Sequence, residues 1–203
     1  MSKLENLISK VNSLDDLSHR KVSALIGALV GDAACLHLEW IYDQDKVSKI
    51  VQNSNPEFWH ENHNPFFDLP NGKLSGYADQ TLQVLNIMAS NNGKFDSTKI
   101  IEHFLKFFGD TESPYQKSLL KRGQGKFPVS GPWLHGALIS MIDRFEAGLD
   151  PPGSEDAIER DAIIAMTPLV LQQVPNLDFE ALKQRFYILT QDPLAIGKLL
   201  LAK

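Results

Sequence analysis

The chain has 203 residues, of which 43% are hydrophobic and 22% are charged, a balance typical of a single globular domain. The formal net charge is −5 and the basic residues are scattered, which excludes the basic surface of a nucleic-acid-binding protein. The single cysteine excludes an internal disulfide, and no uninterrupted apolar run approaches the ~18 residues of a membrane span, so we expect a cytoplasmic protein with no membrane partner.

Residues 21–43 predict a central helix. Their apolar residues recur at the i, i+3, i+4, i+7 spacing of a helix with one buried face. The residues expected on that face are Val22, Leu25, Ile26, Leu29, Val30 and Ala33. Gly27 and Gly31 would let other helices approach closely, and Cys35 is expected in the core. Glu39 follows the apolar run, where a carboxylate is costly unless it is paired, liganded or catalytic.

Residues 53–76 form a long segment rich in Asn, Pro, His and aromatic side chains. Loops longer than ~15 residues in compact domains are usually functional or disordered. The aromatic residues argue against disorder. We therefore expect an ordered loop that wraps over one end of a helix bundle.

The rest of the chain is predicted to be helical. The expected helices cover residues 79–90, 97–108, 114–120, 132–147, 155–173, 178–190 and 193–201. Asp156 and Asp161 are expected to be charges that face solvent. Because no stretch alternates with period two over a useful length, no sheet is predicted. The expected fold class is all-α, with about eight to ten helices in a single domain over residues 1–203.

The junction between the long loop and the next helix holds several oxygen-bearing side chains, in the sequence GYADQT at residues 76–81. One interpretation is structural: Asp79 or Thr81 caps the helix. The other is functional: these oxygens face a pocket shared with the central helix, where carboxylate and hydroxyl groups would suit a hard cation such as Mg²⁺. The residues alone leave both interpretations open.

Four short motifs follow one another in the order found in a known family. They are Gly27 and Gly31 followed by Asp32, Ala33 and Glu39; Tyr77-Ala78-Asp79-Gln80-Thr81; Glu155-Asp156-Ala157 through Ala165-Met166-Thr167-Pro168; and Thr190-Gln191 with Pro193-Leu194-Ala195. In this order they resemble the motifs of the ADP-ribosylglycohydrolases, including the branch that holds the jellyfish J-crystallins and fish selenoprotein J. The resemblance spans about residues 20–203.

This resemblance implies an all-α orthogonal helix bundle that typically binds two Mg²⁺ ions. It implies hydrolysis of the bond between ADP-ribose and a protein side chain or small acceptor, so ADP-ribose or an ADP-ribosylated substrate is the expected partner. Glu39 matches the acidic residue that activates or orients water in some members. Asp79, Gln80 and Thr81 match the metal-ligating motif.

The chain departs from the family pattern in two ways. Ala78 and Gln80 stand where the family has Thr and Asp, which removes a hydroxyl ligand and a negative charge. The family's later Asp-x-Asp motif is not reached before Lys203, so we expect the front two thirds of the domain, without its last helices. Mg²⁺ binding is expected to be weak or absent and the activity reduced or lost, which leaves open whether the chain is an enzyme. The alternative is a non-catalytic, crystallin-like structural or binding protein.

An incomplete domain should also leave part of its last helix uncovered. The residues expected in an exposed apolar patch are Leu194, Ile196, Leu199, Leu200 and Leu201. Such a patch predicts self-association through the C-terminal helix.

Overall fold

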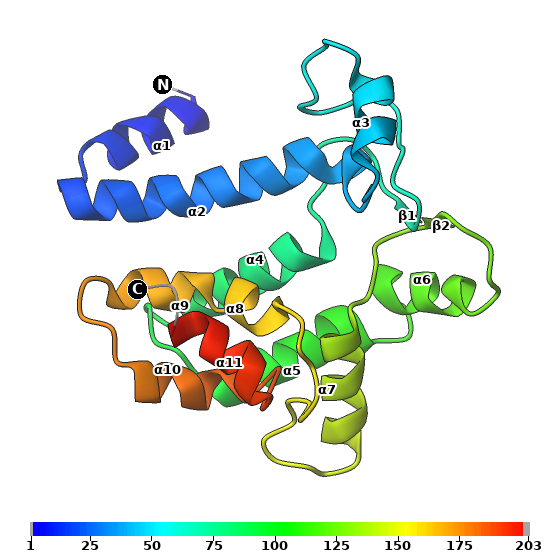
Figure 1. Cartoon of the computed structure of the whole chain (residues 1–203). Helices are drawn as coiled ribbons and strands as arrows, with labels where there is room; N and C mark the ends of the chain where they lie inside the picture. The colour runs from blue at the N-terminus through cyan, green and yellow to red at the C-terminus, as the bar shows by residue number, and fades with distance from the viewer. Residues whose placement is uncertain (1, 201–203) are drawn as a thin grey trace.

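A computed structural model describes the backbone of residues 2–200 and the side chains of residues 2–197. This part of the chain is mostly helical, which confirms the predicted all-α class (Figure 1). The helices are α1 (Lys3–Asn12), α2 (Asp16–Cys35), α3 (Gln44–Val51), α4 (Gly76–Ser90), α5 (Ser97–Phe104), α6 (Pro114–Arg122), α7 (Gly136–Glu146), α8 (Asp161–Ala165), α9 (Thr167–Gln173), α10 (Phe179–Phe186) and α11 (Pro193–Leu200). The 3₁₀ segment η1 (Leu36–Leu38) follows α2, and the π-helical segment η2 (Leu105–Gly109) follows α5.

The main core surrounds α4, which packs against α5, α8 and α9. Its largest fully buried side chains include Phe104, Phe108, Leu138, Met141, Met166, Leu169, Leu182 and Phe186. Figure 1 shows α2 along one side of this bundle, with α1 lying over α2 on the side away from the core. The core therefore fixes the position of α4, whose first turn carries the motif at residues 76–81.

The long loop at residues 53–76 wraps over the C-terminal end of α2, as predicted. The two ring nitrogens of His37 lie 2.7 Å from the Trp59 carbonyl oxygen and 2.8 Å from the Leu69 carbonyl oxygen. The Phe58 amide donates to the Ala34 carbonyl at 2.8 Å. These bonds satisfy polar groups at the helix end and fix the loop to it.

Two short strands, which the sequence pattern did not predict, join this loop to a later part of the chain. Strand β1 (Phe67–Asp68) pairs in parallel with β2 (Val129–Ser130), with Phe67 opposite Val129. Two residues are too few for an alternating pattern to be recognised in the sequence. The pairing holds the loop beside the segment that leads into α7.

Several helix boundaries differ from those predicted. Helix α4 begins at Gly76 because the Ser75 side chain accepts hydrogen bonds from the amides of Tyr77 and Ala78, so Asp79 lies in the first turn and is not the cap. The helix expected over residues 155–173 is two shorter helices. Helix α9 starts anew at Thr167, with Pro168 in its first turn, where the missing amide hydrogen is tolerated.

The outer side of α2 is exposed, contrary to the expectation of a wholly buried apolar face. Ile26 is 47% exposed and Val30 is 50% exposed, and Cys35 is also exposed. Within the described residues, the helical segment Asp16–Leu38 is long and apolar enough, by length and composition, to cross a membrane. This corrects the expectation that no segment of the chain has the length and composition of a membrane span. A single helix of this kind is weak evidence for a membrane span, because core helices of soluble proteins meet the same criteria of length and composition.

The predicted C-terminal patch is only partly present. Leu194 is 69% exposed, as expected, but Ile196 is 5% exposed and belongs to the interior. The side chains of Leu199 and Leu200, and the whole of Leu201, lie outside the described residues. Self-association through this helix stays a prediction.

Candidate active site

Asp32, near the end of α2, binds the residue that caps α4. Its Oδ2 accepts from the Ser75 amide at 2.7 Å, and its Oδ1 accepts from the Ser75 hydroxyl at 2.5 Å. Burial raises the pKa of Asp32, while the two bonds from Ser75 oppose that rise. The central helix and the start of α4 are thus joined by two direct hydrogen bonds.

Glu39, the predicted catalytic residue, follows η1 and is half-buried. Burial, with a smaller effect of the Asp32 charge, raises the pKa of Glu39 to about 7. Its Oε2 is buried and has no hydrogen-bond partner in the described part of the chain. A carboxyl group with a pKa near 7 can both donate and accept a proton at neutral pH, which is the property required of a general acid or base.

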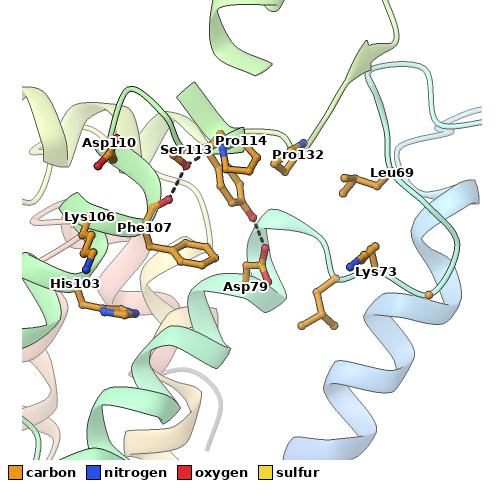
Figure 2. Close-up of a pocket in the computed structure, with 13 residues that line it drawn as sticks. Leu69, Lys73, Asp79, His103, Lys106, Phe107, Asp110, Ser113, Pro114 and Pro132 are labelled. Atoms are coloured by element: carbon orange, nitrogen blue, oxygen red, sulfur yellow. Dashed lines mark hydrogen bonds between the residues drawn. The ribbon is translucent and has the colours of Figure 1, made fainter. Parts of the chain in front are cut away.

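Asp79, the first of the predicted metal ligands, faces a cavity of about 730 Å³ (Figure 2). The Tyr115 hydroxyl donates to Asp79 Oδ2 at 2.6 Å, whereas Asp79 Oδ1 makes no hydrogen bond within the described residues. Burial raises the pKa of Asp79, and the Tyr115 bond lowers it. The Asp32 charge raises the pKa of both Asp79 and Glu39, so the three carboxyl groups lie at the same end of the bundle. Glu39 does not line the cavity.

Gln80 and Thr81, the other two predicted ligands, face α8 and not the cavity. The Gln80 amide nitrogen donates to Asp161 Oδ1 at 2.7 Å and to the Gly76 carbonyl at 3.1 Å. The Thr81 hydroxyl donates to the Ile164 carbonyl at 2.8 Å. Successive residues of a helix point about 100° apart, and here Gln80 and Thr81 point toward α8 while Asp79 lines the cavity. The structure therefore does not bring Asp79, Gln80 and Thr81 together.

Asp161 is the residue that sequence reasoning missed. It was expected to face solvent, but it is fully buried, and its Oδ2 has no partner among the described residues. Burial raises the pKa of Asp161 to about 6, against the opposing effect of the Gln80 hydrogen bond. His135 Nδ1 lies 3.4 Å from Asp161 Oδ1, and burial lowers the pKa of His135 to about 4. The sole sequence signal was that Asp161 precedes the apolar run at residues 162–166.

Close packing fixes His135 against the first turn of α4. The ring centroids of His135 and Tyr77 are 3.9 Å apart, and Trp40 also packs on His135, at 5.9 Å. A Cβ atom added at Gly76 would lie 2.6 Å from the Trp133 carbonyl oxygen and 2.8 Å from the His135 ring. Glycine is therefore required at this position for the backbone to approach the segment before α7.

The cavity beside Asp79 has apolar walls and a charged rim. Its apolar lining comes from Leu69, Leu74, Phe107, Pro114, Tyr115 and Pro132. The charged or titratable side chains besides Asp79 are Lys73, His103, Lys106 and Asp110. Figure 2 shows Asp79 between Lys73 on one side and His103 with Lys106 on the other. A site of this volume and composition is suited to a small organic ligand with hydroxyl and charged groups.

The residues present do not fit a magnesium site. Mg²⁺ requires near-ideal octahedral coordination by oxygen atoms. Asp79 contributes one free oxygen, Ala78 contributes none, and the Thr81 hydroxyl is used by a backbone carbonyl. Residues 2–197 contain no group of three His, Cys, Asp or Glu side chains placed to hold a metal ion.

Comparisons with known proteins identify relatives of the chain. The family model for ADP-ribosylglycohydrolase matches residues 13–190. Crystallin J1A of Tripedalia cystophora is 30% identical over 159 residues, which cover 78% of this chain and 48% of the relative. Crystallin J1B of the same organism is 28% identical with the same coverage, so the chain spans about half the length of these curated relatives. No solved structure matches.

Proposed function

Because the chain belongs to the ADP-ribosylglycohydrolase family, we propose that the cavity at Asp79 binds ADP-ribose or an ADP-ribosylated side chain, with hydrolysis reduced or lost. The observation that carries this proposal is the single free oxygen of Asp79. Tyr115 donates to Oδ2, and Oδ1, which has no hydrogen-bond partner among the described residues, would accept a hydrogen bond from a ribose hydroxyl in the cavity that Asp79 lines. Charge-assisted bonds of this kind are among the stronger polar contacts in proteins.

Glu39 is the residue proposed to transfer the proton if hydrolysis occurs. The reaction adds the hydroxyl of water to the anomeric carbon and the proton to the leaving group. With a pKa of about 7, Glu39 would take the proton from the attacking water or give it to the leaving group. The residues of the site do not fit Mg²⁺, which supports the proposal that hydrolysis is reduced or lost. In a site that held two metal ions, those ions would position the substrate and the attacking water.

Binding and hydrolysis should be measured separately on the purified chain. Isothermal titration with ADP-ribose tests binding, and chromatography of released ADP-ribose from peptides modified on arginine or serine tests hydrolysis. Asp79→Asn should weaken ADP-ribose binding by about tenfold, equivalent to ~1.4 kcal/mol. Glu39→Gln should leave affinity unchanged and abolish any release. The matched control is Asp143→Asn, at an exposed position on α7.

Two results would contradict the proposal: undetectable ADP-ribose binding, or equal affinities for the Asp79→Asn and Asp143→Asn variants. Rapid release of ADP-ribose that depends on added Mg²⁺ would contradict the proposal that hydrolysis is reduced or lost. The alternative function, a non-catalytic structural role, is favoured by the names of the curated relatives, both of which are crystallins. Absence of both binding and release would support that alternative.

A further inference from the structure

The outer side of α2 is apolar and is uncovered in the part of the chain that the structure describes. Its exposed positions in the middle of the helix carry small or aliphatic residues, and we call them the open face of α2. They are Ala24, Ile26, Gly27, Ala28, Val30 and Gly31. The half-buried Leu25 and Leu29 lie on the other side of the helix. An apolar helix face of this kind is a candidate docking surface.

The two glycines of the open face have no role in the packing of a single chain. The sequence predicts that Gly27 and Gly31 let another helix approach closely, but none of the described helices does so. A Cβ atom added at either glycine would meet no atom within 4 Å. Glycine in a helix interior is destabilising relative to alanine because it loses more conformational freedom on folding. The close approach that would explain both glycines therefore has to come from another molecule.

The open face combines a ridge and a groove that match each other. Ile26 and Val30 are four residues apart and both exposed, so their side chains form a ridge along the helix. Gly27 and Gly31 are also four residues apart and form an adjacent groove that contains no side chains. A two-fold rotation between two copies places the ridge of each copy in the groove of the other. A face that carries both parts is self-complementary, which favours a second copy of this chain as the occupant.

The chemistry of the open face disfavours charged partners and membranes. Between Val22 and Cys35 the one charged residue is Asp32, whose two carboxylate oxygens accept from Ser75. A charged partner would therefore find no complementary charge on this face. Helices that lie on membrane surfaces present Trp, Phe or Leu beside Lys and Arg, and the open face contains none of these residue types.

We infer that the chain forms a weak symmetric dimer in which the open faces of two copies cross at Gly27 and Gly31. The crossing covers about 20 Å of a helix that is roughly 10 Å wide. Such a footprint is smaller than the roughly 800 Å² that each partner buries in a standard interface. Leu4, Leu7 and Ile8 of α1 are each at least half exposed beside the N-terminal half of α2 and can add to the contact (Figure 1). The expected dissociation constant is therefore about 10–100 µM.

Sedimentation equilibrium at protein concentrations from about 1 to 500 µM tests this inference, with a monomer–dimer transition expected in that range. Gly31→Gln should fill the groove and weaken the dimer by about tenfold or more, while the open space around Gly31 leaves the monomer unaffected. Val30→Lys should abolish the dimer because it replaces the ridge and brings like charges together at the crossing. The control is Leu194→Lys, which replaces an exposed leucine on α11 and should dimerise as the wild type does.

Thermal melts at about 1 µM, where the wild type is expected to be monomeric, establish that each variant is folded. Gly31→Gln should melt no lower than the wild type at this concentration, because glutamine is a better helix former than glycine and meets no neighbouring atom. Loss of the dimer without loss of monomer stability is the result that a purely structural role of Gly31 would not produce.

Three outcomes would overturn the inference. The first is a wild type that stays monomeric over the whole range of concentrations. The second is a dimer that Leu194→Lys abolishes and Gly31→Gln does not, which would mean that the chain associates through its C-terminal helix. The third is a wild-type monomer that co-sediments with vesicles of phosphatidylcholine and phosphatidylserine when Val30→Lys does not, since lipid would then cover the open face.

Discussion

Replacing Gly76 by alanine should destabilise the protein, although the same change usually stabilises a helix. Alanine is a better helix former than glycine by about 1 kcal/mol. At Gly76, however, the new Cβ would lie 2.6 Å from the Trp133 carbonyl oxygen and within 2.9 Å of two atoms of the His135 ring. A backbone oxygen cannot rotate away as a side chain can, so α4 or the segment before α7 must shift. Forcing an extra methyl group into a packed site costs typically about 1–3 kcal/mol.

Gly27 provides the matched control, because it lies inside α2 and a Cβ added there would meet no neighbouring atom within 4 Å. Gly27→Ala should stabilise the protein by about 0.4–1 kcal/mol through the lower entropy of the unfolded chain. Urea unfolding followed by circular dichroism gives both free energies, and each 1 kcal/mol should move the melting temperature by roughly 2–4 °C in a chain of this size. A Gly76→Ala variant as stable as Gly27→Ala would refute the close approach at Gly76.

Three further predictions concern the ionisable and polar groups of the site. Burial raises the pKa of Glu39 from its usual 4.5 to about 7, so the folded state binds this proton more tightly than the unfolded state does. The free energy of unfolding should therefore fall as the pH rises from about 4.5 to 7. In urea titrations at pH 5 and pH 8, Glu39→Gln should remove about 1–2 kcal/mol of that fall. Tyr115→Phe should lower the free energy of unfolding by about 1.5–3 kcal/mol through loss of the hydrogen bond to Asp79. Because that bond lowers the pKa of Asp79, its removal should raise the pKa further. An NMR titration in which the Asp79 pKa is the same in both proteins would contradict this. Thr81→Val should lower the free energy of unfolding by about 1 kcal/mol through loss of the hydrogen bond to the Ile164 carbonyl. The binding isotherm for Mg²⁺ should be the same as that of the wild type. A changed isotherm would identify Thr81 as a metal ligand.

The sequence predicts the helical class well because helix signals are local. The start of α5 is an example: Asp96 directly precedes the predicted helix, and its side chain accepts from the Lys99 amide at 3.1 Å, as expected of a helix cap. A predicted helix boundary is wrong where a single capping residue, and not the apolar pattern, sets the start of the helix. Ser75 caps α4, so the helix begins at Gly76, three residues before the predicted start at residue 79. Periodicity also identifies an apolar face without showing what covers it, so the exposed positions of Ile26 and Val30 could not be foreseen.

The candidate site was predicted in part. Glu39 and Asp79 were identified from motifs, and the Asp32 charge raises the pKa of both, whereas their roles as catalytic residue and ligand stay predictions. Asp161 was missed because whether a carboxylate is buried depends on its tertiary partners. Its partner Gln80 is 81 positions away in the chain, and no local pattern relates the two residues. Lys73 and Lys106 were not singled out either, since scattered basic residues converge on one cavity only after folding.

The pair of hydrogen bonds from Ser75 to Asp32 couples the geometry of the site to the placement of α2. Ser75 caps α4 and also holds the end of α2, so a displacement of α2 relative to the core must either break these bonds or move the first turn of α4 with it. Asp79 belongs to that turn. By thermodynamic reciprocity, if a ligand that fixes Asp79 restricts α2 through these bonds, a partner that packs on the exposed side of α2 changes the affinity of the cavity by the same factor as the ligand changes the affinity for that partner.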